Sequence, residues 1–570
     1  MSLLRALQNP IFITSIQENN MKKYQFLFVS IVFVSFVLRG LLLSLVPPSP
    51  SLDEVSIGYN AFSILKTGSD EYGNQLPLLL RAYDDYRPAL YVYLVIPFVA
   101  LFGLTIEAVR IPSVLLSLVT VVTVYFLFKE IFKKELKIGS IVLPNMYVAL
   151  LTMLLVAISP WHIYLSRLGH EVNLGLTVTI LGIYFFFRAI DSKHIFASLL
   201  FSAVFFALSF YSYQSQKVIV PFLILTLIIL FWKKLFRHVK ESIGAAVVGF
   251  VIVLPALIVS LSPVGLTRLD GTTVFTDNHT LHQQRLHAFV LAKEEGDILG
   301  QIVYNRRFNN LAIFFGQYIS HFDPQWLFFG NVKEDHKVPY LGLLYIWELP
   351  FLLMGVFVLI KSTIDTKIKI FLFIWFFTSP LAASITTGAP HAMRSFTFIP
   401  IIQLFSALGL VYTYLHMKRF IPQFVVVSVL IIVFVGSIAF FSQQYFYTFP
   451  RFHSDSFQYP LTTALKEVID SNEREKIVVS NEDNLTQSYM FYLFHSKHDP
   501  QKYLAEGGTG SGGFSETHTI SGIEFRPIDY ENEEQHIFLL GNPSDFPENA
   551  RFVKEYTFIS GDSGVVLVQK

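Results

Sequence analysis

The stretch that decides the fold is residues 47–62, PPSPSLDEVSIGYNAF. It follows directly on a long apolar run and places two carboxylates, Asp53 and Glu54, just beyond the end of that run. Val55 and Tyr59 begin an apolar set at helical spacing, which predicts a helix lying on the bilayer surface with its apolar face down. Taken alone, two acids in such a place are typical of solvated charges. The rest of the chain has to decide whether they are functional.

The composition is that of a membrane protein. Of the 570 residues, 53% are hydrophobic and only 15% are charged, against a usual charged share of about 25%. Many apolar runs reach or approach the roughly 20 residues that are needed to cross a bilayer. The chain has no cysteine, which excludes disulfides, thiol catalysis and thiolate metal sites. A net charge of +1 gives no indication of nucleic-acid binding.

Charge sets the orientation of the spans. Basic clusters such as KEIFKKELK (residues 129–137) and KKLFRHVK (residues 233–240) belong on the cytoplasmic side. All of these clusters fall on that side only if residues 88–104, an apolar run of about 16 residues, do not cross the membrane. This segment would then enter the membrane and return to the same side, or lie on the membrane surface. We therefore predict about eleven spans plus one re-entrant or interfacial segment. The predicted spans are residues 24–46, 111–128, 141–160, 172–190, 195–213, 218–232, 242–261, 340–360, 370–385, 396–415 and 424–441.

The chain divides into two predicted domains. Residues 1–441 form a transmembrane catalytic domain, whereas residues 442–570 are polar and their apolar runs are too short to span. A helix is expected over residues 459–470. Strands are expected at residues 476–480, 536–540 and 565–569. The fold class is therefore a polytopic α-helical membrane protein with a small extracytoplasmic α/β domain at the C-terminus.

On the outer face, this topology gathers carboxylates, histidines and arginines from separate loops. A general base together with several cations is what the activation of a hydroxyl and the departure of a phosphate require. Arg110 and Arg394 also suit the head-group ends of spans, which is the simpler explanation for each alone. Asp70 and Glu71, in the first outer loop, are typical of solvated charges. The candidate site residues are Asp53, Glu54, Arg87, Arg110, Arg167, His170, Glu171, His321, His391 and Arg394.

Six segments together resemble the GT-C glycosyltransferases. They are LDE (residues 52–54), RPALYVY (87–93), EAVRIPSVL (107–115), SPWHIYLSRLGHEVN (159–173), SHFDPQWLF (320–328) and HAMRSFTFIP (391–400). The group that they resemble most is that of the protein O-mannosyltransferases and lipid A aminoarabinose transferases. The resemblance implies a GT-C fold and transfer of a sugar, expected to be a single residue, from a polyprenyl-phosphate carrier. It also implies inversion at the anomeric carbon on the extracytoplasmic face of the plasma membrane.

The resemblance also implies roles for individual residues. Asp53 matches the general base on the acceptor hydroxyl, and Glu54 would orient Asp53 or bind the sugar. Glu171 stands where relatives have aspartate, so its role as metal ligand, sugar contact or neither stays open. The donor phosphate and sugar would be held by Arg87, Arg110, Arg167, His170, Glu171, His321, His391 and Arg394.

The expected partners follow from this chemistry. They are a polyprenyl-phosphate-linked sugar, membrane lipids and an acceptor that is a protein, a lipid or a polysaccharide. No cofactor is expected, because a sugar phosphodiester already has a good leaving group; a divalent cation is the open alternative. Two other functions stay open: an oligosaccharyltransferase-like enzyme that uses a divalent metal, and a transporter or flippase for a lipid-linked glycan. The sequence shows no internal repeat, which argues against the transporter.

Overall fold

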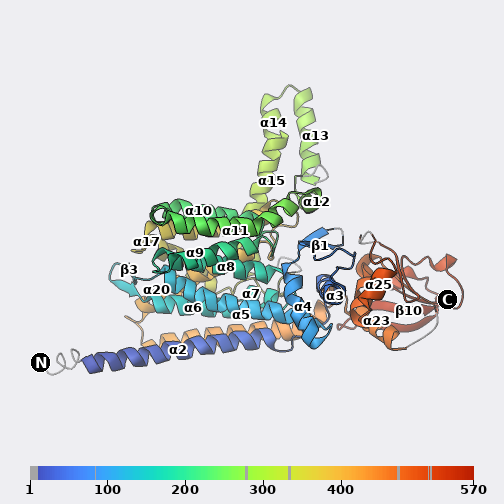
Figure 1. Cartoon of the computed structure of the whole chain (residues 1–570), viewed down its shortest axis with the longest axis horizontal. Coiled ribbons are helices and arrows are strands. Elements are labelled where there is room, and N and C mark those ends of the chain that lie inside the picture. The colour runs from blue at the N-terminus through green and yellow to red at the C-terminus, as the bar shows by residue number, and fades with distance from the viewer. Residues whose placement is uncertain are drawn as a thin grey trace.

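In the computed structural model, the chain forms a helical bundle with a sheet domain at one end (Figure 1). The structure describes residues 10–83, 85–275, 280–330, 336–471, 476–510, 513 and 516–570. The bundle helices run along the long axis of the molecule, and the sheet domain, which contains the C-terminus, lies at the far end from the start of α2. The hairpin of β3 (Leu136–Ile138) and β4 (Ile141–Leu143), which follows a basic cluster, lies at the other end.

Eight helices among the described residues are long and apolar enough to cross a membrane. They contain α2 (Pro10–Gly40), α5 (Ile106–Ile131), α8 (Val172–Ile190), α10 (Gln216–Arg237), α11 (Val239–Ser260), α18 (Thr366–Thr378) with α19 (Leu381–Ser384), η1 (Phe396–Phe398) with α20 (Ile399–Met417), and α21 (Gln423–Gln443) with η2 (Gln444–Thr448) and α22 (Phe449–Phe452). The chain is thus a multi-pass integral membrane protein, as the hydropathy predicts.

The remaining predicted spans are shorter or broken helices. α6 (Asn145–Ile158) and α7 (Pro160–Ser166) meet at 56° and make up to a ninth span. The bend lies at Pro160, whose ring and missing N–H prevent a continuous helix. α9 (Ile195–Ser209) and α17 (Glu348–Lys361) have 15 and 14 residues, fewer than a full span needs. The described residues therefore contain eight or nine helices long enough to span a membrane, fewer than the eleven spans that we predict from apolar runs.

The segment that we predict to be re-entrant or interfacial forms α4 (Leu90–Phe102). With 13 residues it is too short to cross a bilayer. It lies near the end of the bundle that carries the sheet domain (Figure 1) and packs against α3 (Leu52–Thr67) and α5. Gly103, with φ of 73°, ends it, and Thr105 caps the start of α5.

The long loop that we expect over residues 262–339 contains helices of its own. They are α12 (Pro263–Thr272), α13 (Thr280–Glu294), α14 (Ile298–Val303), α15 (Arg306–Ser320) and α16 (Pro324–Phe328). α13, α14 and α15 project from the side of the bundle (Figure 1). The end of α15 returns the chain to the bundle, where His321 follows it.

The C-terminal part forms a six-stranded mixed sheet with the strand order β6-β7-β5-β8-β10-β9. The expected helix is α23 (Tyr459–Ser471), and the three expected strands are β5 (Ile477–Val479), β8 (Phe538–Gly541) and β10 (Ser563–Gln569). The strands not anticipated are β6 (His518–Ile520), β7 (Ile523–Phe525) and β9 (Phe552–Thr557). α24 (Ser488–Ser496) and α25 (Pro500–Ala505) connect β5 to the β6–β7 hairpin. β5 lies parallel to both β7 and β8, and the other pairs are antiparallel.

α3 links the bundle to the sheet domain. The helix that we predict to lie on the bilayer surface forms, but it is buried on both faces, because it packs against α4, α5, α24 and α25. A Cβ added at Gly58 would lie 2.5 Å from the Phe494 ring and 2.9 Å from Val109. The small residues on the polar face of this helix therefore permit close contact with a second layer of protein. This packing holds the start of α3 between the membrane domain and the sheet.

Candidate active site

The start of α3 turns its two acids in different directions. A capping box fixes this turn: the Ser51 hydroxyl accepts from Glu54 N, and the Glu54 carboxylate accepts from Ser51 N. Adjacent helical residues lie about 100° apart, so Asp53 and Glu54 do not share a face. The Asp53 side chain is 48% exposed and the Glu54 side chain is 1% exposed. The pair therefore occupies two different environments.

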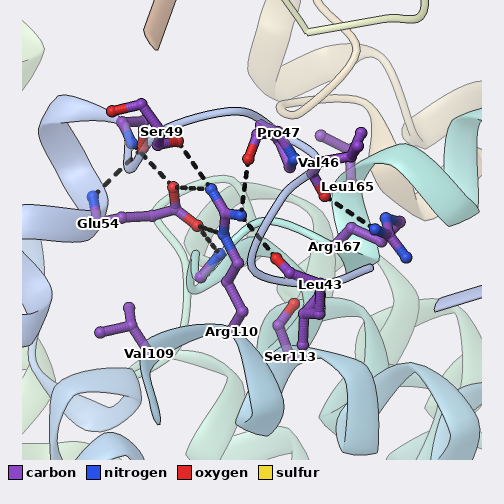
Figure 2. A network of polar contacts seen from close by, with 12 residues as sticks. Leu43, Val46, Pro47, Ser49, Glu54, Val109, Arg110, Ser113, Leu165 and Arg167 are labelled. Carbon is purple, nitrogen blue, oxygen red and sulfur yellow. Dashed lines mark hydrogen bonds and ion pairs between the residues drawn. The ribbon is translucent and has the colours of Figure 1, made fainter. Parts of the chain in front are cut away.

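Glu54 forms a buried ion pair with Arg110 (Figure 2). Arg110 Nε lies 2.7 Å from Oε1 and Nη2 lies 3.0 Å from Oε2. Gly169 N also donates to Oε1, at 2.7 Å. Both carboxylate oxygens are thus occupied by protein donors. Glu54 is buried in a hydrogen-bond network that joins α3, α5 and the loop before α8. The structure therefore does not support a catalytic role for Glu54 beside Asp53.

Arg110 and Arg167 hold the chain between α2 and α3. An arginine carries five N–H donors. Arg110 donates to Glu54 and to the carbonyls of Leu43, Pro47 and Ser49. Arg167 donates to the Tyr445 hydroxyl and to the carbonyls of Leu38, Arg39, Leu42 and Val46. Both side chains are fully buried, and protein acceptors engage all of their donors, so both arginines hold the loop that leads to Asp53.

Asp53 faces Arg87 and His170. Arg87, on β2 (Asp85–Pro88), donates from Nη2 to Asp53 Oδ1 across 2.7 Å. Burial by itself lowers the pKa of Arg87, but the carboxylates of Asp53 and Glu171 outweigh burial and raise that pKa above its ordinary value. His170 Nε2 lies 3.8 Å from Asp53 Oδ2, and His170 Nδ1 accepts from Val172 N. The neutral imidazole then carries its proton on Nε2, toward Asp53.

These residues line a cavity of about 280 Å³. It brings together parts of α3, the β1–β2 hairpin, the start of α8, the loop before α10 and the loop before η1; β1 spans Leu79–Ala82. Of the predicted site residues, it contains Asp53, Arg87, His170, Glu171, His391 and Arg394. The predicted residues that do not line it are Glu54, Arg110, Arg167 and His321.

Sequence reasoning missed three cavity residues, Tyr83, Tyr213 and His336. The Tyr83 hydroxyl donates to Leu52 O at 2.7 Å, and the Tyr213 ring packs edge-on against His170. The three do not belong to the segments that resemble GT-C enzymes. Tyr83 lies at the turn of a hairpin and Tyr213 just after a helix, whereas His336 lies in the connection between α16 and α17, where the sequence gives no signal.

His321 supports the cavity from behind. Its Nε2 accepts from His391 N at 3.2 Å, and its Nδ1 lies 2.8 Å from Gln317 O, which makes Nδ1 the protonated nitrogen. Burial lowers the pKa of His321 to about 4. A neutral, enclosed histidine of this kind does not neutralise a phosphate. It positions the loop of His391, whose ring stacks on His336 with centroids 5.0 Å apart.

A second cavity of about 220 Å³ adjoins the first and shares Tyr213 and Arg394 with it. Arg394 donates from Nη1 to Thr386 Oγ1 and to Thr387 O, both at 2.7 Å. The rest of the wall comes from the start of α10, from α12 and from α19, and includes Lys217 and the apolar side chains of Val218, Leu266 and Ile385. Arg394 thus stands between a polar cavity and a more apolar one.

Comparison with known proteins relates part of the chain to a family of enzymes. Residues 86–259 match the family model described as dolichyl-phosphate-mannose-protein mannosyltransferase. This match contains Arg87, Arg110 and the loop of His170. This segment is therefore similar to glycosyltransferases of the GT-C type. No curated protein sequence gives a significant match.

Solved structures of one enzyme, ArnT, share the fold of this chain. ArnT from Cupriavidus metallidurans in the apo state is 10% identical, with a TM-score of 0.52 over 97% of this chain and 98% of that one. The same protein bound to undecaprenyl phosphate is 11% identical, with a TM-score of 0.52 over 96% and 98%. The archaeal oligosaccharyltransferase AglB from Archaeoglobus fulgidus is 11% identical, with a TM-score of 0.49 over 84% and 64%. The likeness to ArnT covers the bundle and the sheet domain together.

Glu171 is the acid of the candidate site with the fewest hydrogen-bond donors around it. Its side chain is 4% exposed, and its Oε2 has no hydrogen-bond donor among the described residues. That oxygen lies 3.5 Å from His170 Nδ1. No group of three or more His, Asp or Glu side chains in the described part of the chain is arranged to hold a metal ion. Glu171 is thus a buried acceptor at the wall of the cavity.

Asp70 and Glu71, which we expect to be solvated, are both buried. Glu71 accepts from Asn60 Nδ2 and from Thr509 Oγ1, each at 2.8 Å, and its backbone carbonyl accepts from Thr509 N. Burial raises the pKa of Glu71 to about 7, against the smaller effect of the hydrogen bonds. The loop was expected to face water, but the sheet domain covers it. Glu71 therefore joins the loop between α3 and β1 to that domain.

Proposed function

We propose that this glycosyltransferase moves a single sugar from a polyprenyl-phosphate carrier to a hydroxyl acceptor, with inversion at the anomeric carbon. The observation that carries the proposal is the exposed Asp53 carboxylate paired with Arg87 in a cavity that also holds His170, Glu171 and Arg394. A carrier of this class is supported by the ArnT structure that contains undecaprenyl phosphate. The acceptor hydroxyl belongs to a protein, a lipid or a polysaccharide.

The proposed site of reaction is the extracytoplasmic face of the plasma membrane. Lys133 and Lys234 both pair with Asp191, and Thr363 N donates to Lys137 O, so basic loops from several helices meet at one end. The positive-inside rule assigns that end to the cytoplasm. The cavity and residues 442–570, which we treat as a separate domain, then face outward.

The proposed chemistry is a direct displacement. The acceptor oxygen attacks the anomeric carbon, the bond from that carbon to the phosphate oxygen breaks, and the carrier leaves as a phosphate. Asp53 takes the proton of the hydroxyl, a contribution of about 10²–10⁴-fold for a well-placed base. Arg87 and Arg394 offset the charge that develops on the leaving phosphate. Attack opposite to the leaving group inverts the anomeric centre.

Because Asp53 is paired with Arg87, binding of the sugar donor would also change the basicity of Asp53. A phosphate that draws an N–H group of Arg87 competes with Asp53 for the same guanidinium. Asp53 then loses part of its cationic partner and becomes a stronger base when the donor is present. His170 Nε2 faces the same carboxylate at 3.8 Å from Oδ2, which is beyond hydrogen-bond distance. Glu171, with its unmatched acceptor, is the proposed contact for a sugar hydroxyl.

The second cavity is the proposed entrance of the carrier. Its wall joins the polar site at Arg394, and its apolar residues suit the first isoprene units of a lipid. The phosphate would lie where the two cavities meet. No cofactor is part of this proposal.

The test is transfer in reconstituted vesicles from a panel of labelled polyprenyl-phosphate sugars. Asp53→Asn is expected to lower turnover by about 10²–10⁴-fold. The matched control is Asp323→Asn, since Asp323 only caps α16 and asparagine caps equally well. Equal turnover in wild type and Asp53→Asn would refute the base. Lipid movement across vesicles without glycosidic transfer would favour a flippase, and loss of transfer with a chelator would favour the metal-dependent oligosaccharyltransferase.

A further inference from the structure

The sheet domain contains a crevice at a place where mixed α/β sheets bind ligands. From β5 the chain passes through α24 and α25 to β7 on one side, and β8 then lies on the other side of β5. β5 and β8 are parallel, and Ser480 N donates to Leu540 O beyond the end of β5. The loops that follow these two strands therefore diverge. Crevices outside the carboxyl ends of strands at such a switch point are the usual ligand sites of these sheets.

A cavity of about 320 Å³ occupies this position. The loop after β5 contributes Asp483 and Asn484, and the loop after β8 contributes Asn542 and Ser544. The chain between α22 and α23 closes the remaining side with Asp455 and Gln458. Residues around the turn from β9 to β10 also line the cavity, so four separate segments converge on one space: these residues are Phe558, Ser563, Gly564 and Val565. The cavity shares no lining residue with the candidate active site.

Two side chains of this wall each have one polar atom without a hydrogen-bond partner among the described residues, although the Asn542 side chain also caps a short helix. Asn542 is 8% exposed, and its Nδ2 has no hydrogen-bond partner among the described residues. Oε1 of Gln458 is also buried without a partner in the described part of the chain. A buried donor or acceptor without a partner destabilises the folded protein, so the position of these two atoms beside a cavity points to a ligand that supplies the missing contacts.

The backbone at the rim is strained in the same place. Gln458 has a φ of 45° and Asp483 a φ of 51°, in the left-handed region that non-glycine residues rarely adopt. Such conformations are energetically unfavourable and are common at binding sites, where the surrounding structure holds them. Strain and unmatched polar groups therefore coincide on two sides of one crevice.

The lining selects the chemical class of the ligand. None of the described residues around the cavity is Lys or Arg, and two are aspartates, so an anionic ligand is disfavoured. Amides, hydroxyls and carboxylates suit a ligand rich in hydroxyl groups. Pro460, Leu461 and Phe558 add apolar surface for the C–H face of a sugar ring. We propose that this crevice binds a neutral saccharide.

The crevice is connected to the membrane domain. α23 begins beside it, and Thr462 Oγ1 on that helix lies 2.7 Å from Ser49 Oγ. The Ser49 carbonyl in turn accepts from Arg110. A saccharide held here lies on the part of the sheet domain that contacts the loop leading to Asp53. The proposal itself does not depend on Asp53 being the base.

The test uses the full chain in lipid nanodiscs, because maltoside detergents carry a sugar of their own. Methyl glucoside, methyl mannoside and a disaccharide of N-acetylglucosamine are probed by saturation-transfer NMR, with glucuronic acid as the anionic counterpart. At least one neutral sugar is expected to bind, and glucuronic acid more weakly. Binding by none of the neutral sugars, or tighter binding of glucuronic acid, would overturn the proposal.

Substitutions of residues that line the crevice test whether the saccharide binds there. Asp483→Asn, which keeps a residue tolerant of positive φ, and the exposed Asn484→Ala together are expected to weaken binding by about tenfold or more. Gln501→Ala, an exposed amide on α25 outside the crevice, is the control and is expected to bind normally. Asp53→Asn is also expected to bind normally, which separates this site from the transferase site. Unchanged affinity in the double variant contradicts the proposed location.

Discussion

Arg87 on β2 and Asp53 on α3 form an ion pair, with Nη2 2.7 Å from Oδ1, although 34 positions separate them in the chain. The Arg87 side chain is 7% exposed, whereas the Asp53 side chain is 48% exposed. The arginine is thus held in the wall of the cavity while the carboxylate reaches into it. This asymmetry is what a base that must meet a substrate, and a cation that must stay in place, require.

Replacing Arg87 should weaken the binding of the carrier lipid. Arg87→Gln removes the cation and is expected to lower the affinity for polyprenyl phosphate by about 10–100-fold, while Arg87→Lys retains part of it, because lysine keeps the charge but not the planar fork. The measurement is a titration of purified protein with polyprenyl phosphate. Arg81→Gln, on the same hairpin but outside the cavity, is the control. An affinity that is unchanged in Arg87→Gln would show that the phosphate binds elsewhere.

Breaking the Glu54–Arg110 pair should destabilise the protein. Arg110→Gln leaves a buried carboxylate without its partner, and such changes cost about 3–5 kcal/mol. We expect a clear fall in melting temperature in detergent, and no such fall in the control Arg307→Gln, at an exposed position on α15.

The double variant Glu54→Gln/Arg110→Gln tests the same pair further. Because the two side chains contact each other, its cost should be less than the sum of the two single changes. Strict additivity would argue against the buried pair.

The stability of the contact between the first outer loop and the sheet domain should depend on pH through Glu71. Its pKa is about 7 in the folded protein, above the ordinary carboxyl value, so the folded state holds the proton more tightly. Stability from this group is full below about pH 4.5 and is lost as pH rises to about 7, by about 3 kcal/mol at most.

Melting temperatures between pH 5 and pH 8 measure this effect. Glu71→Gln should flatten the decline with pH relative to wild type, because glutamine does not titrate. Histidines with lowered pKa, such as His321, act in the opposite direction in both proteins, so the difference between the two curves isolates Glu71. Identical curves would assign the decline to other groups.

The orientation in the membrane can be tested with single cysteines, since the chain has none of its own. Gln501→Cys, in the sheet domain, should react with a membrane-impermeant maleimide in intact cells. Lys193→Cys, in the exposed loop between α8 and α9, should react only after permeabilisation. The opposite pattern would reverse the proposed orientation.

Much of the fold could be predicted because hydropathy acts locally. A helix was found within each predicted span, and Pro160 and Gly103 end helices for reasons that are visible in the sequence. The number of full-length spans was overestimated, because an apolar run also arises where a short helix such as α9 packs inside the bundle. The helix at residues 52–67 was likewise expected, but burial of both its faces was not, since the covering residues lie in α24 and α25.

The sequence by itself determined that this is a multi-pass membrane protein and that Asp53 and Glu54 begin a helix just after the first span. Only the tertiary structure decided which charged residues meet in the cavity. The sequence does not distinguish the roles of the three arginines Arg87, Arg110 and Arg167. In the structure, all N–H groups of Arg110 donate to Glu54 and to backbone carbonyls. All N–H groups of Arg167 donate to Tyr445 and to backbone carbonyls. Whether a buried arginine has a donor left for a ligand depends on partners that are distant in the chain, and local sequence carries no record of them.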